Sequence, residues 1–224
     1  APKLALHYRL LFDVDQLHRG LLRLEVDDVS HTSVLGPDSG VLKVQAGETS
    51  RLAQFGQYLV EGTFHIWIGF DHVLFLLSLL LPAVLVHESR RWTGVGSFRA
   101  ALTEVLWVVT AFTVAHSITL SIAALEIVEL PSRLVESAIA FSVALAAANN
   151  LWPVVERRRW LVAFGFGLIH GFGFASVLTE LGLPRDALVL SLLGFNLGVE
   201  VGQLVIVACF LPAAFLLRNT SLYR

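Results

Sequence analysis

Four histidines of the 224-residue chain lie inside long apolar stretches, where ionisable side chains are rare: His65, His72, His116 and His170. Such side chains are costly at bilayer depth, so they usually face the interior of a helix bundle and mark a functional site. Imidazole binds first-row transition metals, and it can also relay protons. The positions of these histidines do not distinguish the two uses.

Two of the histidines and an aspartate share one short motif. The segment from His65 to His72 has the sequence His-Ile-Trp-Ile-Gly-Phe-Asp-His. On a straight helix the two imidazoles would point in nearly the same direction, but their Cα atoms would lie about 10 Å apart along the axis. One ion could join both only with fully stretched side chains or with a kink near Gly69. The simpler interpretation places His65 at the membrane interface, with Asp71 as a buried acceptor that orients a histidine.

Carboxylates and amides occur in the later apolar stretches. Glu136 and Asn150 lie on one stripe of a predicted helix, although Glu136 is close enough to the start of that helix to reach the interface. Three further residues share one polar helix face because their positions are i, i+4 and i+7: Asn196, Glu200 and Gln203. A carboxylate as deep as Glu200 is difficult to explain by packing, so this face favours a function.

His170 is surrounded by four glycines: Gly165, Gly167, Gly171 and Gly173. Glycines at four-residue spacing let two helices approach closely, so packing alone would explain them. The same close approach would bring His170 toward the polar groups of other helices. We expect both explanations to hold.

The composition indicates a membrane protein. Hydrophobic residues make up 55% of the chain and charged residues only 15%, against roughly a quarter charged in soluble domains. Five apolar stretches have about the 20-residue length that a spanning helix needs: residues 65–87, 100–125, 132–153, 160–180 and 187–217. We therefore expect an all-α membrane protein, a bundle of about five transmembrane helices in contact with the lipid bilayer. The sequence does not fix the oligomeric state, and a homo-oligomer is one of the alternatives.

Residues 1–50 follow a different pattern. Apolar and polar residues alternate in short runs between turns, which is typical of β-strands. So short a segment buries too little surface to fold alone, and we interpret it as the end of a larger β domain. Residues 49–64 have one apolar side at helical spacing, which predicts an amphipathic helix at the membrane surface. The chain thus divides into a β segment, 1–50, and a transmembrane domain, 51–224.

The arginines between and after the predicted spans fall on one side of the bundle. They form three groups: Arg90, Arg91 and Arg99; Arg157, Arg158 and Arg159; and Arg218 and Arg224. By the positive-inside rule this side faces the cytoplasm. The predicted location is the bacterial cytoplasmic (inner) membrane, with the N-terminus and β segment extracytoplasmic and the C-terminus cytoplasmic.

Imidazole and carboxylate ligands suit nickel, cobalt, zinc or iron. The chain contains no methionine and only one cysteine, Cys209, which argues against a soft site for Cu(I). Its net charge of -2 and the lack of a basic patch argue against a nucleic-acid partner. A first-row divalent metal ion is therefore the expected ligand.

These motifs resemble the HupE/UreJ family of hydrogenase and urease accessory membrane proteins, in particular its longer branch with an extracytoplasmic β domain. The resemblance covers about residues 55–217. It rests on five motifs: His65 with Gly69-Phe70-Asp71-His72, Ala115-His116-Ser117, Glu136-Ser137, His170-Gly171-Phe172-Gly173-Phe174, and Gly194 through Glu200. It implies secondary uptake of Ni²⁺ or Co²⁺, with His65, Asp71 and His72 as ligands. In the family's short nickel-associated members, the motif that corresponds to His170 contains a second histidine. This chain departs from them, because His170 is followed by Gly171-Phe172-Gly173-Phe174.

The expected metal site combines side chains from several spans. Its ligands are His65, Asp71, His72, His116 and His170, with Glu136, Asn150, Asn196, Glu200 and Gln203 as supporting polar groups. Two other functions fit the same residues. In a membrane zinc hydrolase, Glu136 or Glu200 would activate water at a site with three protein ligands and an open position. In a membrane anchor or sensor the metal would be structural and held by four ligands. A permease site should instead lie near the midplane, between paths that open alternately.

Overall fold

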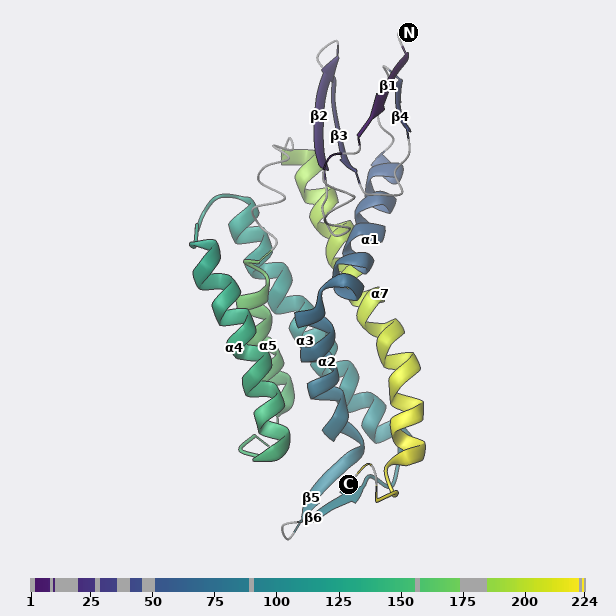
Figure 1. The fold of residues 1–224 in the computed structure, drawn as a ribbon, viewed down its shortest axis with the longest axis vertical. Coiled ribbons are helices and arrows are strands. Elements are labelled where there is room, and N and C mark those ends of the chain that lie inside the picture. Colours follow the sequence, from purple (N-terminus) through teal and green to yellow (C-terminus); the bar gives the residue numbers. More distant parts are fainter. Residues whose placement is uncertain are drawn as a thin grey trace.

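The computed structural model shows a mainly helical molecule (Figure 1). It describes residues 3–8, 10, 20–26, 29–35, 41–45, 51–88, 91–155, 158–173, 185–221 and 223. The helices are α1 (Arg51–Ile68), α2 (Phe70–Leu80), the 3-10 helix η1 (Leu81–Val84), α3 (Phe98–Ala124), α4 (Ser132–Leu151), α5 (Arg159–His170) and α7 (Arg185–Leu217). They run up and down along the long axis, so sites built from several helices lie inside the bundle.

The described strands pair in three antiparallel sheets of two strands each. The pairs are β1 (Lys3–His7) with β4 (Val41–Gln45), β2 (Gly20–Val26) with β3 (Val29–Leu35), and β5 (Leu85–Glu88) with β6 (Arg91–Gly94). The first two sheets lie at one end of the helices, and β5 and β6 lie with the C-terminus at the other end (Figure 1). Strands predicted in residues 1–50 are therefore present, while their place in a larger domain stays a prediction.

Three described helices are long and apolar enough to cross a membrane: Phe98–Ala124, Ser132–Leu151 and Leu188–Leu217. The pair Arg51–Ile68 and Phe70–Val84 would make a fourth span, bent by 71°. The expected span at 160–180 is described only as far as residue 173, and α5 covers its first part. A helical membrane protein is thus confirmed, the described helices include three to four candidate spans, and the fifth stays a prediction.

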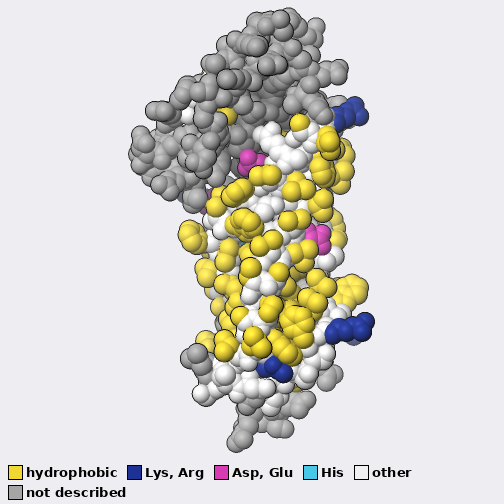
Figure 2. All heavy atoms as spheres, turned by 90° about the vertical axis from the view of Figure 1, so that its right-hand side faces the viewer, with side chains coloured by type: hydrophobic (Ala, Val, Ile, Leu, Met, Phe, Trp, Pro, Cys, Tyr) yellow, Lys and Arg dark blue, Asp and Glu magenta, His cyan; other side chains and the backbone are white. Residues whose placement is uncertain are grey.

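The outer surface of the helices is apolar. Figure 2 shows hydrophobic side chains over the middle of one face, with the Lys and Arg side chains of that face near its ends. Large apolar side chains such as Trp107, Phe141 and Leu193 are 60–65% exposed. So much exposed apolar surface is unfavourable in water and suits the acyl chains of lipids.

The N-terminal helix differs from the prediction. Residues 49–64 were expected to form a surface helix separate from the first span, but α1 continues without a break to Ile68 and packs along α7. The reason is glycine: a Cβ added at Gly62 would meet the Phe195 carbonyl of α7, and one added at Gly198 would meet the Leu59 carbonyl of α1. Backbones this close make α1 part of the bundle rather than a helix that rests on the membrane.

Arginines from all three predicted groups lie at one end of the molecule. Nε of Arg218, just after α7, donates to the carbonyl of Val95, just before α3, at 2.9 Å. Arg159, at the start of α5, pairs with Glu104 on the first turns of α3 at 3.3 Å. This end also contains β5 and β6 (Figure 1). The described arginines of these three groups therefore share one side, and which compartment that side faces stays a prediction.

Candidate metal centre

The break between α1 and α2 brings His65 and His72 together. Gly69 has φ −73° and ψ 95°, so the chain leaves the helix there and α2 starts in a new direction. The centroids of the two imidazole rings lie 4.6 Å apart. A Cβ at position 69 would lie 2.7 Å from Nδ1 of His72 and 2.8 Å from the carbonyl oxygen of His65. Of the two ways in which these histidines could approach one ion, the structure thus has the kink near Gly69, and only glycine fits there.

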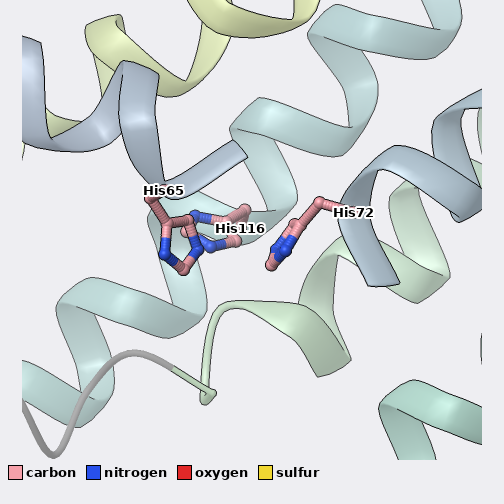
Figure 3. Close-up of side chains that lie close together, drawn as sticks. All are labelled: His65, His72 and His116. Atoms are coloured by element: carbon pink, nitrogen blue, oxygen red, sulfur yellow. The ribbon is translucent and has the colours of Figure 1, made fainter. Parts of the chain in front are cut away.

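Two more histidines reach this point from α3 and α5. The ring of His116 lies 6.3 Å from that of His65 and 6.4 Å from that of His72, and the ring of His170 lies 5.1 Å from that of His72. Figure 3 shows His65, His72 and His116 pointing toward one another from separate segments. His116 and His170 are almost completely buried. The sequence-predicted histidines from three parts of the chain therefore converge.

Close packing of α5 against α3 positions His170. A Cβ at Gly167 would lie 2.5 Å from the carbonyl oxygen of Phe112, and one at Gly171 would meet Thr119 and the carbonyl of His116. The glycines around His170 thus serve helix packing, and that packing brings His170 to the other histidines. Both explanations given for these glycines apply together.

The converging side chains form two overlapping groups with the spacing of metal ligands. Within each group, one potential ligand atom per residue lies within 4.8 Å of the others: His65, His72 and His116 in one group, and Asp71, His72 and His170 in the other. His72 belongs to both. All five side chains that the sequence suggested as ligands are therefore present in one cluster.

Hydrogen bonds fix the orientation of two of these imidazoles. Nδ1 of His72 lies 3.2 Å from the Asp71 carboxylate, which can only accept when ionised, so Nδ1 carries the proton. Nδ1 of His116 lies 3.4 Å from Oδ1 of Asn196, and the Asn196 amide is itself held by donation to the Leu192 carbonyl at 2.8 Å. In each ring Nε2 then carries the lone pair that a metal requires.

His170 is oriented by a serine on α4. Oγ of Ser142 donates to the Ile139 carbonyl at 2.6 Å and lies 2.9 Å from Nε2 of His170. Since the serine proton is already used, Nε2 of His170 donates and its Nδ1 carries the lone pair. Among the described residues, no hydrogen-bond partner contacts Nε2 of His72, Nε2 of His116 or Nδ1 of His170.

Three buried nitrogens with lone pairs and no donor suit a metal ion. Buried polar atoms are normally hydrogen-bonded, and leaving one without a partner is costly. Metal-binding histidines typically donate their other ring nitrogen to a carboxylate, carbonyl or similar group, as these three do. The rings of Phe112 and Phe195 lie nearly parallel to that of His116, with centroids 6.0 and 6.4 Å from it, and add apolar surroundings to the site. The arrangement can coordinate a divalent ion that prefers nitrogen and oxygen ligands.

The predicted polar face of α7 lies against α3. Asn196 contacts His116, Oγ1 of Thr110 donates to Glu200 at 3.2 Å, and Oγ1 of Thr113 donates to Oε1 of Gln203 at 3.0 Å. Gln203 is buried and Glu200 is half-buried. These side chains continue the polar interior from the histidine cluster along the α3–α7 interface.

Two of the expected supporting residues lie elsewhere. The side chain of Glu136 is exposed on α4. Asn150 donates from Nδ2 to the Ser78 carbonyl of α2 at 2.8 Å, which ties the end of α4 to α2. Neither belongs to the ligand groups found among the described residues. Ser142 was not anticipated, because serine is common in helices that pack closely and only the position of His170 gives it a role.

One comparison with known proteins gives a match. The family model described as HupE / UreJ protein matches residues 41–224. The match includes the bent helix pair, every ligand of the cluster and the α7 polar face. The chain matches no curated protein and no solved structure.

Proposed function

This chain is a member of the HupE/UreJ family, and from that premise we propose that it is a permease for a divalent transition-metal ion of the nickel or cobalt type. The family and the His/Asp cluster agree on the handling of a metal ion. Nickel and cobalt are the ions that the family resemblance implies, and both accept imidazole and carboxylate ligands. The ion is the transported substrate in this proposal.

The observation that carries the proposal is the 71° break between His65 and Asp71. Secondary transporters typically bind their substrates where a membrane-spanning helix is interrupted. The broken pair supplies His65 on one side of Gly69 and Asp71 and His72 on the other, while α3 and α5 supply His116 and His170. An enzyme needs a fixed site, whereas ligands on two half-helices can separate when one half moves.

The shared residue His72 supports a transport step. An ion held with His65 and His116 and an ion held with Asp71 and His170 would both use this imidazole, and in the second group the Asp71 carboxylate would turn from Nδ1 of His72 to the ion. An ion can therefore pass between the two groups without leaving His72. Each group has three protein ligands rather than a closed set of four, which favours exchange over a structural role. Asp71, in the first turn of α2, supplies negative charge to an otherwise neutral ligand set.

The same proposal extends to the topology. In it, α1 with α2 forms the first of five spans, and the fourth is the expected span at 160–180, of which the structure describes α5 and residues 171–173. The end that holds Arg99, Arg158 and Arg218 faces the cytoplasm of a bacterial inner membrane, as the positive-inside rule favours. Residues 1–50 then form an extracytoplasmic segment, and residues 51–224 form the membrane domain. Cysteine labelling of intact cells near Ser39 and near Arg158 tests this orientation.

Uptake into proteoliposomes tests the function. Wild type should accumulate radioactive nickel or cobalt under an imposed pH or voltage gradient, and His72→Ala should abolish the accumulation because it removes a ligand from both groups. His87→Ala, a histidine in β5 outside the cluster, is the matched control and should transport normally. If wild type accumulates neither ion above empty vesicles under any gradient, the permease proposal fails and the zinc hydrolase takes its place.

A further inference from the structure

A cleft of about 990 Å³ opens at the arginine-bearing end, between the start of α3 and the start of α5. It is separate from the histidine cluster. Its charged and aromatic lining consists of Arg99, Glu104, Trp107, Arg158, Arg159 and Trp160. Within the described part of the lining, three guanidinium groups thus share one cleft with one carboxylate.

The charges in this cleft do not cancel. Arg159 is nearly buried and lies 3.3 Å from Glu104, so these two neutralise each other. Arg99 and Arg158 are exposed, and within the described part of the chain neither forms an ion pair with a carboxylate. The first turns of α3 and α5 contain no acidic residue. Among the described residues that line it, the cleft therefore has an excess of two positive charges, which attracts an anion.

The tryptophans place the cleft at the depth of lipid headgroups. The side chains of Trp107 and Trp160 line it and are 65% and 42% exposed. Exposed tryptophans of membrane proteins concentrate at the interface between acyl chains and water. Candidate span α3 begins at Phe98, directly beside Arg99. At this depth the abundant anion is a lipid phosphate rather than a dissolved one.

We propose that this cleft binds the phosphate headgroup of an anionic phospholipid through Arg99 and Arg158. Basic pockets between membrane helices on the cytoplasmic side bind such headgroups. Arginine suits the role because its planar guanidinium forms paired hydrogen bonds with phosphate oxygens. The bound lipid bridges the starts of α3 and α5, whose far ends contribute His116 and His170. This inference does not depend on the transported ion.

Native mass spectrometry of the full chain in detergent tests the proposal, with phosphatidylglycerol, phosphatidylcholine and inorganic phosphate as probes. Wild type should bind one phosphatidylglycerol and bind phosphatidylcholine at least about tenfold more weakly, because only the former has a net negative charge. The double variant Arg99→Gln with Arg158→Gln should weaken phosphatidylglycerol binding about 30-fold. The matched control is Arg51→Gln with Arg133→Gln, which removes two exposed arginines from the opposite end and should retain binding.

A lysine double variant separates loss of charge from misfolding. Arg99→Lys with Arg158→Lys should keep phosphatidylglycerol binding within about fivefold of wild type, because both charges remain. Equal binding of the two lipids by wild type would overturn the proposal, as would unchanged binding in the glutamine variant or an equal loss in the control. Displacement of phosphatidylglycerol by inorganic phosphate at equal concentration would reassign the cleft to a free anion.

Discussion

Nδ1 of His72 lies 3.2 Å from Oδ1 of Asp71, the residue immediately before it, because α2 begins at this point after the break at Gly69. On a regular helix, adjacent residues point about 100° apart, so their side chains do not face each other. Here both residues lie in the first turn of α2, and their side chains nevertheless meet. The carboxylate both orients the imidazole and adds negative charge beside it.

The Asp71–His72 contact predicts that the aspartate matters for affinity. Asp71→Asn keeps the size of the side chain and removes its charge, so metal affinity should fall about 10- to 100-fold, as for other partners of metal-binding histidines. Equilibrium dialysis of the purified protein with nickel or cobalt measures this. Glu129→Gln removes an equal charge from an exposed loop and should leave the affinity unchanged. An equal loss in both variants would indicate a general charge effect instead.

The glycine at the break predicts that a substitution at this position weakens metal binding. Gly69→Ala should lower metal affinity at least about tenfold, because its Cβ would push His72 and the His65 carbonyl away. Gly56→Ala is the matched control: a Cβ there meets no atom within 4 Å, so it should bind metal normally. It should also stabilise α1 by about 0.5–1 kcal/mol. Normal metal binding by Gly69→Ala would show that the two half-helices can shift without loss of the site.

Sequence patterns predicted much of this site but not its closest contacts. Apolar stretches with buried histidines indicated the ligands, and a kink near Gly69 was one of the two ways in which His65 and His72 could share an ion. The packing of α1 on α7 was not predicted, although Gly194, Gly198 and Gly202 at four-residue spacing were a usable signal. The exposed position of Glu136 could not be derived, because a helical stripe shows which residues share a face and not which face points inward.

Ser142 connects α4 to the site and gives a third prediction. In Ser142→Ala the acceptor for Nε2 of His170 is lost, so the imidazole can turn or change tautomer, and metal affinity should fall about tenfold. Ser137→Ala is the control on the same helix, since its hydroxyl only donates to the Arg133 carbonyl. Dialysis with both variants measures the difference. If the two variants bind metal equally well, His170 is not held by Ser142 in the working protein.

Glu200 separates transport from hydrolysis. In a permease its carboxylate compensates the charge of the ion along the α3–α7 interface, so Glu200→Gln should depress uptake into proteoliposomes while the protein stays folded and inserted. In a hydrolase the same change should leave metal bound and remove turnover, because the carboxylate would act as general base. Glu136→Gln, at an exposed position on α4, should leave uptake unchanged. Full uptake by Glu200→Gln would remove this residue from the ion path.

In the proposed site an ion is held at His72 together with further ligands, either His65 and His116 or Asp71 and His170. X-ray absorption spectroscopy of the purified protein loaded with nickel tests this most directly, because scattering from imidazole rings identifies the ligands. We expect one nickel per chain with two or three imidazoles in wild type, and one imidazole fewer or no bound nickel in His72→Ala and in at least one of His116→Ala and His170→Ala. Full occupancy with an unchanged spectrum in all three variants would contradict it.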